Sequence, residues 1–214
     1  MIMLILKNYL IFFENLKIPF SPVFAYSSEN KSHELSNFSE SIDSLKKEFN
    51  ILLRYYIKKI ENKELIYNNS INKLLKSIEL RLKNFYGCSG GYSMFSITSD
   101  GEIYSCEHLV GKKGYSIGNI NNINSSMHNN VIHAENVENI ESCNYCWARY
   151  LCSGGCFSSN ISSTGNIRIP ETSRCDLIRA EWEYIISLYI LIKQKYPDYI
   201  KQLLVNEYDK ESVS

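Results

Sequence analysis

The first half of the chain has the three- and four-residue spacing of apolar positions that marks amphipathic helices. One apolar stripe predicts a helix at about 39–62, through Ile42, Leu45, Phe49, Leu52, Tyr56 and Ile60. Asn37, three residues before Glu40, has the spacing of an N-cap and its partner. A second stripe predicts a helix at about 70–85, through Ile71, Leu74, Leu75, Ile78 and Leu82.

The pattern before these helices is less regular. Residues 1–18 form either an apolar helix or a buried strand–helix fragment, because periodicity does not separate the two. Residues 18–25 have the composition of a strand, although Pro19 and Pro22 exclude a regular central strand over the whole length. The polar stretch 26–36 is expected to link this segment to the first long helix.

The second half begins with a predicted β-hairpin. Two apolar segments, residues 94–98 and 103–106, flank an Asp-Gly dipeptide at 100–101. Asp-Gly between apolar strands is a strong hairpin signal, because glycine adopts positive φ at low cost. The turn is expected to bring Cys106 back towards the start of the first strand, near Cys88.

The remaining elements follow from shorter patterns. Residues 115–120 predict a short strand and turn, residues 124–138 a weak helix, and residues 158–173 a polar loop. Apolar spacing predicts a helix at about 176–196, and Pro197 separates it from a last short helix.

Length and composition exclude some classes of protein. The 214 residues suffice for one sizeable core, or for one small domain and part of another. Acidic and basic residues number 23 each, which argues against a nucleic-acid-binding face. Nothing approaches the ~20 apolar residues of a membrane span. The opening apolar run lacks a preceding positive charge and is soon interrupted by Lys7 and Glu14, so we expect a cytoplasmic protein without a secretory signal.

Cysteine carries the main candidate chemistry. Four of the seven cysteines fall within fourteen residues with spacings x2, x5 and x3, namely Cys143, Cys146, Cys152 and Cys156. Cys88 and Cys106 precede this run, and Cys175 follows it. Thiolates are soft ligands for zinc and iron, and short spacings let one turn present several sulfurs to one metal centre.

Three interpretations of the cysteines compete: structural zinc, disulfides and iron–sulfur clusters. The odd count and a reducing compartment argue against disulfides. The x5 and x3 spacings, with seven sulfurs instead of four or eight, favour iron–sulfur clusters over zinc. Gly154 and Gly155 permit close backbone approach between Cys152 and Cys156. The nearby aromatic residues are expected to pack around such a site: Tyr145, Trp147 and Tyr150.

The complete pattern is Cys88-x12-Gly101-x4-Cys106, then Cys143-x2-Cys146-x5-Cys152-x3-Cys156, then Cys175. It resembles the SPASM domain, the auxiliary-cluster domain of many radical S-adenosylmethionine enzymes. Residues 100–106 and 146–156 are most similar to maturases of ribosomally made peptides, which form thioether or related crosslinks.

The resemblance covers about residues 86–196 and implies an α+β fold. Residues 1–85 would be a residual barrel strand with linking helices, from the end of a radical S-adenosylmethionine barrel. Residues 86–196 would be a small cysteine-rich domain with a β-hairpin and C-terminal helices, and residues 197–214 a last helix and tail.

The same resemblance implies two [4Fe-4S] clusters, serving electron transfer and substrate docking. It assigns one cluster to Cys143, Cys146, Cys152 and Cys175, and the other to Cys88, Cys106 and Cys156. Ser89 to Ser105 contain no further cysteine, which implies an open iron or a non-cysteine ligand at the second set. Glu107 and His108 are close enough in sequence to be candidates, but we expect them to face solvent or cap loops.

The radical-generating motif C-x3-C-x2-C does not occur in this chain. We therefore expect the C-terminal portion of a radical maturase that is not competent alone, with S-adenosylmethionine bound only by a missing N-terminal part. No catalytic residue is predicted. The expected partners are a precursor peptide and a separate radical S-adenosylmethionine polypeptide, without nucleic acid or membrane. Two alternatives remain: a non-catalytic peptide- or partner-binding module, and a structural zinc protein.

Overall fold

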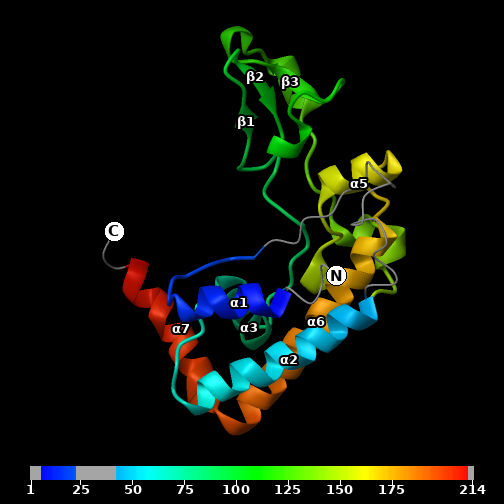
Figure 1. The fold of residues 1–214 in the computed structure, drawn as a ribbon. Coiled ribbons are helices and arrows are strands. Elements are labelled where there is room, and N and C mark those ends of the chain that lie inside the picture. The colour runs from blue at the N-terminus through cyan, green and yellow to red at the C-terminus, as the bar shows by residue number, and fades with distance from the viewer. Residues whose placement is uncertain (1–5, 23–41, 212–214) are drawn as a thin grey trace. The chain divides into compact units, whose positions relative to one another are not determined.

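The computed structural model describes residues 6–22 and 42–211. The chain divides into two compact units. We call residues 83–175 the sheet unit, and residues 1–82 with 176–214 the helical unit. Helices and a small antiparallel sheet together make a mixed α+β fold, as predicted (Figure 1). Within the described residues, none of the helices has the length and apolar character to cross a membrane.

The sheet unit contains the predicted hairpin and a third strand. Strands β1 (Ser96–Ile97), β2 (Glu102–Tyr104) and β3 (Ser116–Asn119) form an antiparallel sheet in the order β1-β2-β3 (Figure 1). In the hairpin, Ser96 pairs with Tyr104 and Ile97 with Ile103. The turn requires glycine at 101, where φ is +88°. Both the hairpin and the strand expected at 115–120 are confirmed.

Short helices occupy the rest of the sheet unit. Five are 3-10 helices: η4 (Glu107–Leu109), η5 (Ile120–Asn122), η6 (Ser125–Asn130), η7 (Val137–Asn139) and η8 (Glu141–Cys143). The α-helices are α4 (Arg149–Cys152) and α5 (Phe157–Thr164). The weak helix predicted at 124–138 is wrong, because η6 and η7 are separate 3-10 turns.

The polar loop predicted at 158–173 is also wrong, because α5 occupies its first half. Phe157 and Ile161, four residues apart, bury the same helix face in the core of the unit. The hydroxyls of Ser162 and Ser163 donate to the carbonyls four residues earlier, at 2.9 and 2.8 Å. These local bonds satisfy the polar side chains within the helix, so a polar composition does not exclude helix here.

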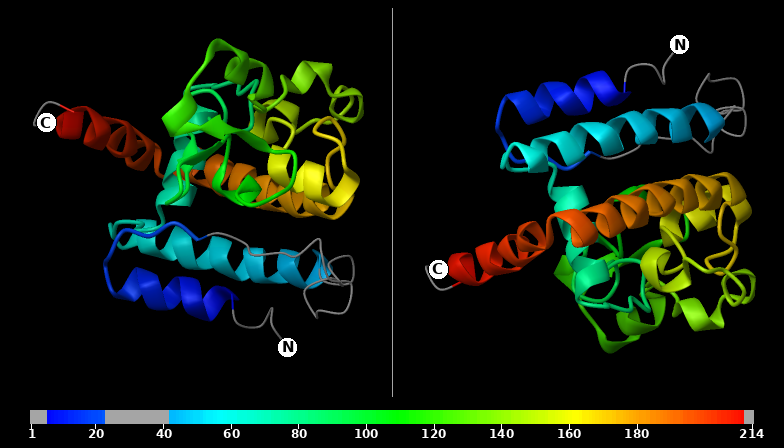
Figure 2. Two further views of the ribbon diagram at one scale, coloured as in Figure 1. Left: turned by 90° about the horizontal axis from the view of Figure 1, so that it is seen from above. Right: turned by 90° about the horizontal axis from the view of Figure 1, so that it is seen from below.

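The described residues of the helical unit form five helices. These are α1 (Leu6–Asn15), α2 (Ile42–Glu61), α3 (Asn69–Glu79), α7 (Pro197–Glu211) and the part of α6 (Thr172–Lys195) that follows residue 175. Helix α1 lies alongside α2, and α3 contacts α7 (Figure 2). The predicted stripe of α2 is buried, and Phe49 stacks on Tyr184 of α6 with ring centroids 4.9 Å apart.

Three predictions in the helical unit concern where elements begin and end. Helix α3 ends at Glu79 and not near 85, because Arg81 adopts a left-handed φ of 54° after the cap at Leu80. The strand predicted at 18–25 is wrong within residues 18–22, where Phe20 makes only an isolated bridge. The rest of that segment and the expected N-cap Asn37 lie outside the described residues.

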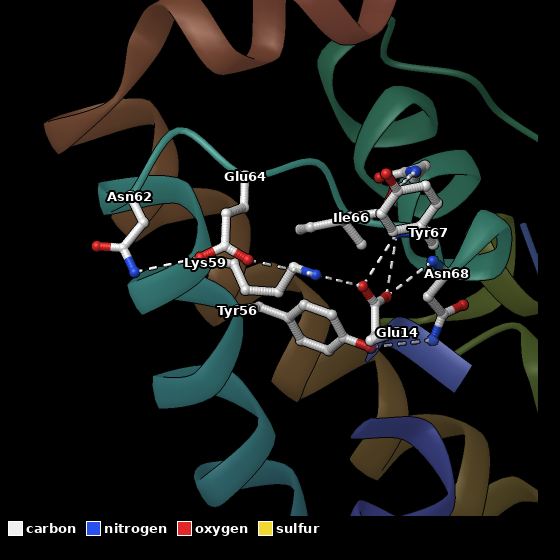
Figure 3. Close-up of polar contacts among 9 residues, drawn as sticks. Glu14, Tyr56, Lys59, Asn62, Glu64, Ile66, Tyr67 and Asn68 are labelled. Atoms are coloured by element: carbon white, nitrogen blue, oxygen red, sulfur yellow. Dashed lines mark hydrogen bonds and ion pairs between the residues drawn. The ribbon is translucent and has the colours of Figure 1, made fainter. Parts of the chain in front are cut away.

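A buried carboxylate joins three segments of the helical unit (Figure 3). The side chain of Glu14 in α1 is 0% exposed, and its Oε2 lies 2.8 Å from Nζ of Lys59 in α2. Its Oε1 accepts hydrogen bonds from the backbone N–H groups of Tyr67 and Asn68, at 3.1 and 2.9 Å. Asn68 is the N-cap of α3. Burial, followed by the charge of Glu14, raises the pKa of Tyr56 far above its usual value.

Replacing Glu14→Gln should lower the free energy of unfolding of the helical unit by about 3–5 kcal/mol, because the ammonium of Lys59 stays buried without a counter-charge. Urea denaturation followed by circular dichroism measures this change. The matched control is Glu183→Gln, whose pair with Lys46 is exposed and should contribute at most about 1 kcal/mol. Equal losses in the two variants would contradict a structural role for the buried pair.

Candidate metal centre

All seven cysteines lie in the sheet unit, and none forms a disulfide. Cys106 and Cys143 are buried, while the other five are partly buried. Among the described residues, no three His, Cys, Asp or Glu side chains lie where they would hold a single metal ion.

Three thiols form a first group, which we call the three-thiol group: Cys88, Cys106 and Cys156. Burial raises the pKa of Cys88, and the neighbouring Cys156 thiol raises it further. Burial also raises the pKa of Cys106, with Glu107 and then Cys156 adding to the effect. Cys156 is therefore an electrostatic neighbour of both hairpin-associated cysteines.

Four thiols form a second group, which we call the four-thiol group: Cys143, Cys146, Cys152 and Cys175. Burial raises the pKa of Cys152 to about 12, and all three other thiols of the group contribute. Burial likewise raises the pKa of Cys143, and the neighbouring thiols of Cys175 and Cys146 raise it further. Cys175 belongs to the first turn of α6 and is the last residue of the sheet unit.

Close backbone contact brings Cys88 to Cys156. A Cβ on Gly87 would lie 2.4 Å from the carbonyl oxygen of Gly155, so only glycine allows this approach. The hydroxyl of Ser153 donates to the carbonyl of Asn84 at 2.9 Å. The Asn84 N–H donates to the carbonyl of Tyr150 at 3.0 Å. The segment before Cys88 thus contacts residues 150–155, on both sides of Cys152.

A left-handed turn separates Cys152 from Cys156. Ser153, Gly154 and Gly155 have φ values of 59°, 81° and 77°. The Asn160 side chain in α5 donates to the Gly154 carbonyl at 3.1 Å and holds the turn in place. Sequence reasoning anticipated the two glycines but missed Asn160, because its segment was predicted to be a loop.

Backbone amides point at the sulfurs of both groups. The N–H groups of Gly90 and His108 bond the sulfurs of Cys88 and Cys106, and each bond opposes the rise in pKa. Gly155 does the same for Cys152. Amide hydrogen bonds to thiolate sulfur are one of the means by which proteins tune iron–sulfur clusters. Soft thiol donors, partial burial and amide bonds together fit an iron–sulfur cluster at each group.

The flanking residues occupy different environments. Tyr150 packs against the buried cluster of Val137, Ile140 and Cys143, as expected. Tyr145 is 96% exposed and Trp147 is 52% exposed, so the expectation that they pack around the site is wrong in this unit. The sequence does not distinguish the packed Tyr150 from the exposed Tyr145 and Trp147, because an aromatic residue close to a cysteine can be either buried or exposed.

Comparison with known proteins agrees with this picture. Residues 88–147 match the family model of SPASM, described as an iron–sulfur cluster-binding domain. The match includes Cys88, Cys106, Cys143 and Cys146. No curated protein sequence matches the chain significantly.

Several solved structures have a similar fold. Native anSMEcpe with bound AdoMet is 18% identical, with a TM-score of 0.53 over 78% of this chain and 46% of that one. A tagged form with bound AdoMet is 19% identical, with a TM-score of 0.55 over 85% and 48%. Native anSMEcpe with AdoMet and the Cp18Cys peptide is 19% identical, with a TM-score of 0.54 over 77% and 46%.

The chain spans about half the length of these structures, and the likeness at this level of identity concerns the fold. The domain match and the fold confirm the resemblance inferred from the cysteine spacing. Residues 88–147 are thus similar to the SPASM iron–sulfur cluster-binding domain, and the chain shares its fold with part of anSMEcpe.

Proposed function

We propose that the chain binds two [4Fe-4S] clusters, one at each thiol group, and that they serve electron transfer and peptide docking in a radical S-adenosylmethionine maturase. The observation that carries the proposal is the division of the seven thiols into neighbours of Cys156 and neighbours of Cys152. This division coincides with the ligand sets that the SPASM resemblance implies.

The chain's own residues have definite tasks in this proposal. Cys143, Cys146, Cys152 and Cys175 would hold one cluster, and Cys88, Cys106 and Cys156 the other. Bound clusters would supply one-electron transfer. The amide donors at Gly90, His108 and Gly155 would stabilise the thiolate form of their cysteines, and partial burial would limit access of water.

The proposed substrate is a ribosomally made precursor peptide, modified by a thioether or related crosslink. The fold supports this assignment, since anSMEcpe has been solved with AdoMet and with two peptides. Because this chain contains no C-x3-C-x2-C motif, cleavage of S-adenosylmethionine would require a further polypeptide segment. The chain would therefore act as the cluster-bearing portion of the enzyme.

Anaerobic reconstitution should give about eight iron and eight sulfide per chain, as two cubanes require. Colorimetric iron and sulfide analysis with metal quantification by mass spectrometry measures this. Stoichiometric zinc in colourless protein after strictly anaerobic purification would contradict the proposal and support a structural zinc protein.

Single substitutions should divide the iron between the two groups. Cys156→Ala should remove the cluster of the three-thiol group and leave about four iron per chain. The matched variant Cys146→Ala should instead remove the cluster of the four-thiol group. Electron paramagnetic resonance of the reduced proteins should show complementary losses. Loss of both signals or of neither in Cys156→Ala would contradict the ligand assignment.

The reconstituted 214-residue chain, given S-adenosylmethionine and a strong reductant, should produce no 5′-deoxyadenosine. The physical reason is that all seven thiols are assigned to the two groups, which leaves none for a radical-generating cluster. Chromatography of the reaction mixture measures the product. Turnover by this chain alone would contradict the proposed division of labour.

A further inference from the structure

The two thiol groups are unequal, and the difference leaves one ligand unassigned. A [4Fe-4S] cluster has four irons, each of which takes one ligand from outside the cluster. The four-thiol group supplies four sulfurs, whereas the three-thiol group supplies three. If the proposed function holds, one iron at the three-thiol group needs a ligand of another kind.

The carboxylate of Glu107 contacts one thiol of this group, that of Cys106. Its Oε2 lies 3.6 Å from Sγ of Cys106 and accepts a hydrogen bond from the thiol.

The backbone fixes Glu107 in this place. Cys106 is the N-cap residue of η4, and Glu107 is the first residue of that helix. The helix is anchored by Leu109, which is 0% exposed and packs in the same core cluster as Cys106. The N–H of Leu109 donates to the Cys106 carbonyl at 3.0 Å, and that of Val110 to the Glu107 carbonyl at 3.2 Å. The backbone of Glu107 is therefore fixed next to Cys106, while its side chain is largely exposed.

Two other side chains near the group are weaker candidates. The imidazole of His108 lies beside the other carboxylate oxygen of Glu107, with Nε2 3.7 Å from Oε1, and the two side chains are 67% and 61% exposed. Ser158 is 2% exposed, with its hydroxyl 3.2 Å from Sγ of Cys156. A neutral hydroxyl suits hydrogen bonding to a thiolate, whereas a carboxylate is already the anionic oxygen ligand that iron accepts.

We propose that the Glu107 carboxylate is the fourth ligand of the cluster bound by Cys88, Cys106 and Cys156. In this arrangement the cluster has three sulfur ligands and one oxygen ligand.

Electron–nuclear double resonance of the reduced protein, produced with glutamate labelled with ¹³C at the side-chain carboxyl, tests the ligand directly. The wild type should show a ¹³C coupling to the cluster, and Glu107→Gln should lose it. The matched control is Glu141→Gln, an exposed carboxylate two residues before Cys143 in the four-thiol group, which should retain it. Absence of coupling in the wild type, or its persistence in Glu107→Gln, would overturn the proposal.

Mild oxidation gives a second readout. An iron held by an exchangeable ligand or none is the first to leave a cubane, so Glu107→Gln should accumulate a three-iron cluster several-fold faster than the wild type. Glu107→Cys should restore retention, and Ser158→Ala should behave as the wild type. Faster loss in Ser158→Ala with no change in Glu107→Gln would assign the ligand to Ser158 instead.

Iron content separates this inference from the proposed function. About eight iron per chain without a Glu107-dependent coupling would overturn only the carboxylate ligand. Failure of the wild type to bind iron would overturn the two-cluster function and the ligand together.

Discussion

The sheet unit depends on one constraint: Cys152 and Cys156 are four residues apart, yet their thiols have different neighbours. An ordinary helical turn would place side chains four residues apart on one face. The three successive left-handed residues Ser153, Gly154 and Gly155 prevent this by ending α4 and reversing the chain before α5. Each non-glycine residue in this conformation costs about 1–2 kcal/mol, which explains why glycine occupies two of the three positions of the turn.

The same turn determines how distant segments meet. Its Gly155 carbonyl leaves room only for a glycine at 87, and its Ser153 hydroxyl holds the Asn84 carbonyl. Cys88 therefore reaches Cys156 through contacts made by the turn, and not through the hairpin alone. On the other side, Cys152 neighbours Cys143, Cys146 and Cys175.

The division of the cysteines into two ligand sets is implied by the SPASM resemblance and stays a prediction, whereas the cysteine pattern that carries the resemblance depends only on residue identity and short sequence separation. The helix α2 and the hairpin at Gly101 follow from equally local signals. Helix α5 does not follow from a local signal. Its formation depends on the burial of Phe157 and Ile161 in a core formed by residues distant in sequence. Sequence adjacency to Cys106 makes Glu107 a candidate ligand, but the contact of its carboxylate with Sγ depends on how Leu109 anchors η4. The end of α3 depends on a backbone reversal at Arg81 that no residue type demands.

The two units differ in how their cores are made. The helical unit buries long apolar side chains on α2 and α6 and closes them with the Glu14–Lys59 pair. In the sheet unit, the clusters of buried residues include Cys106 and Cys143 themselves, beside Tyr104, Leu109 and Phe157. Burial holds these thiols in their neutral form, whereas a metal ligand must be the thiolate. Ligand binding would thus release protons and add its free energy to the folding of the sheet unit. Under the proposed function, the stability of the sheet unit would therefore depend on cluster binding.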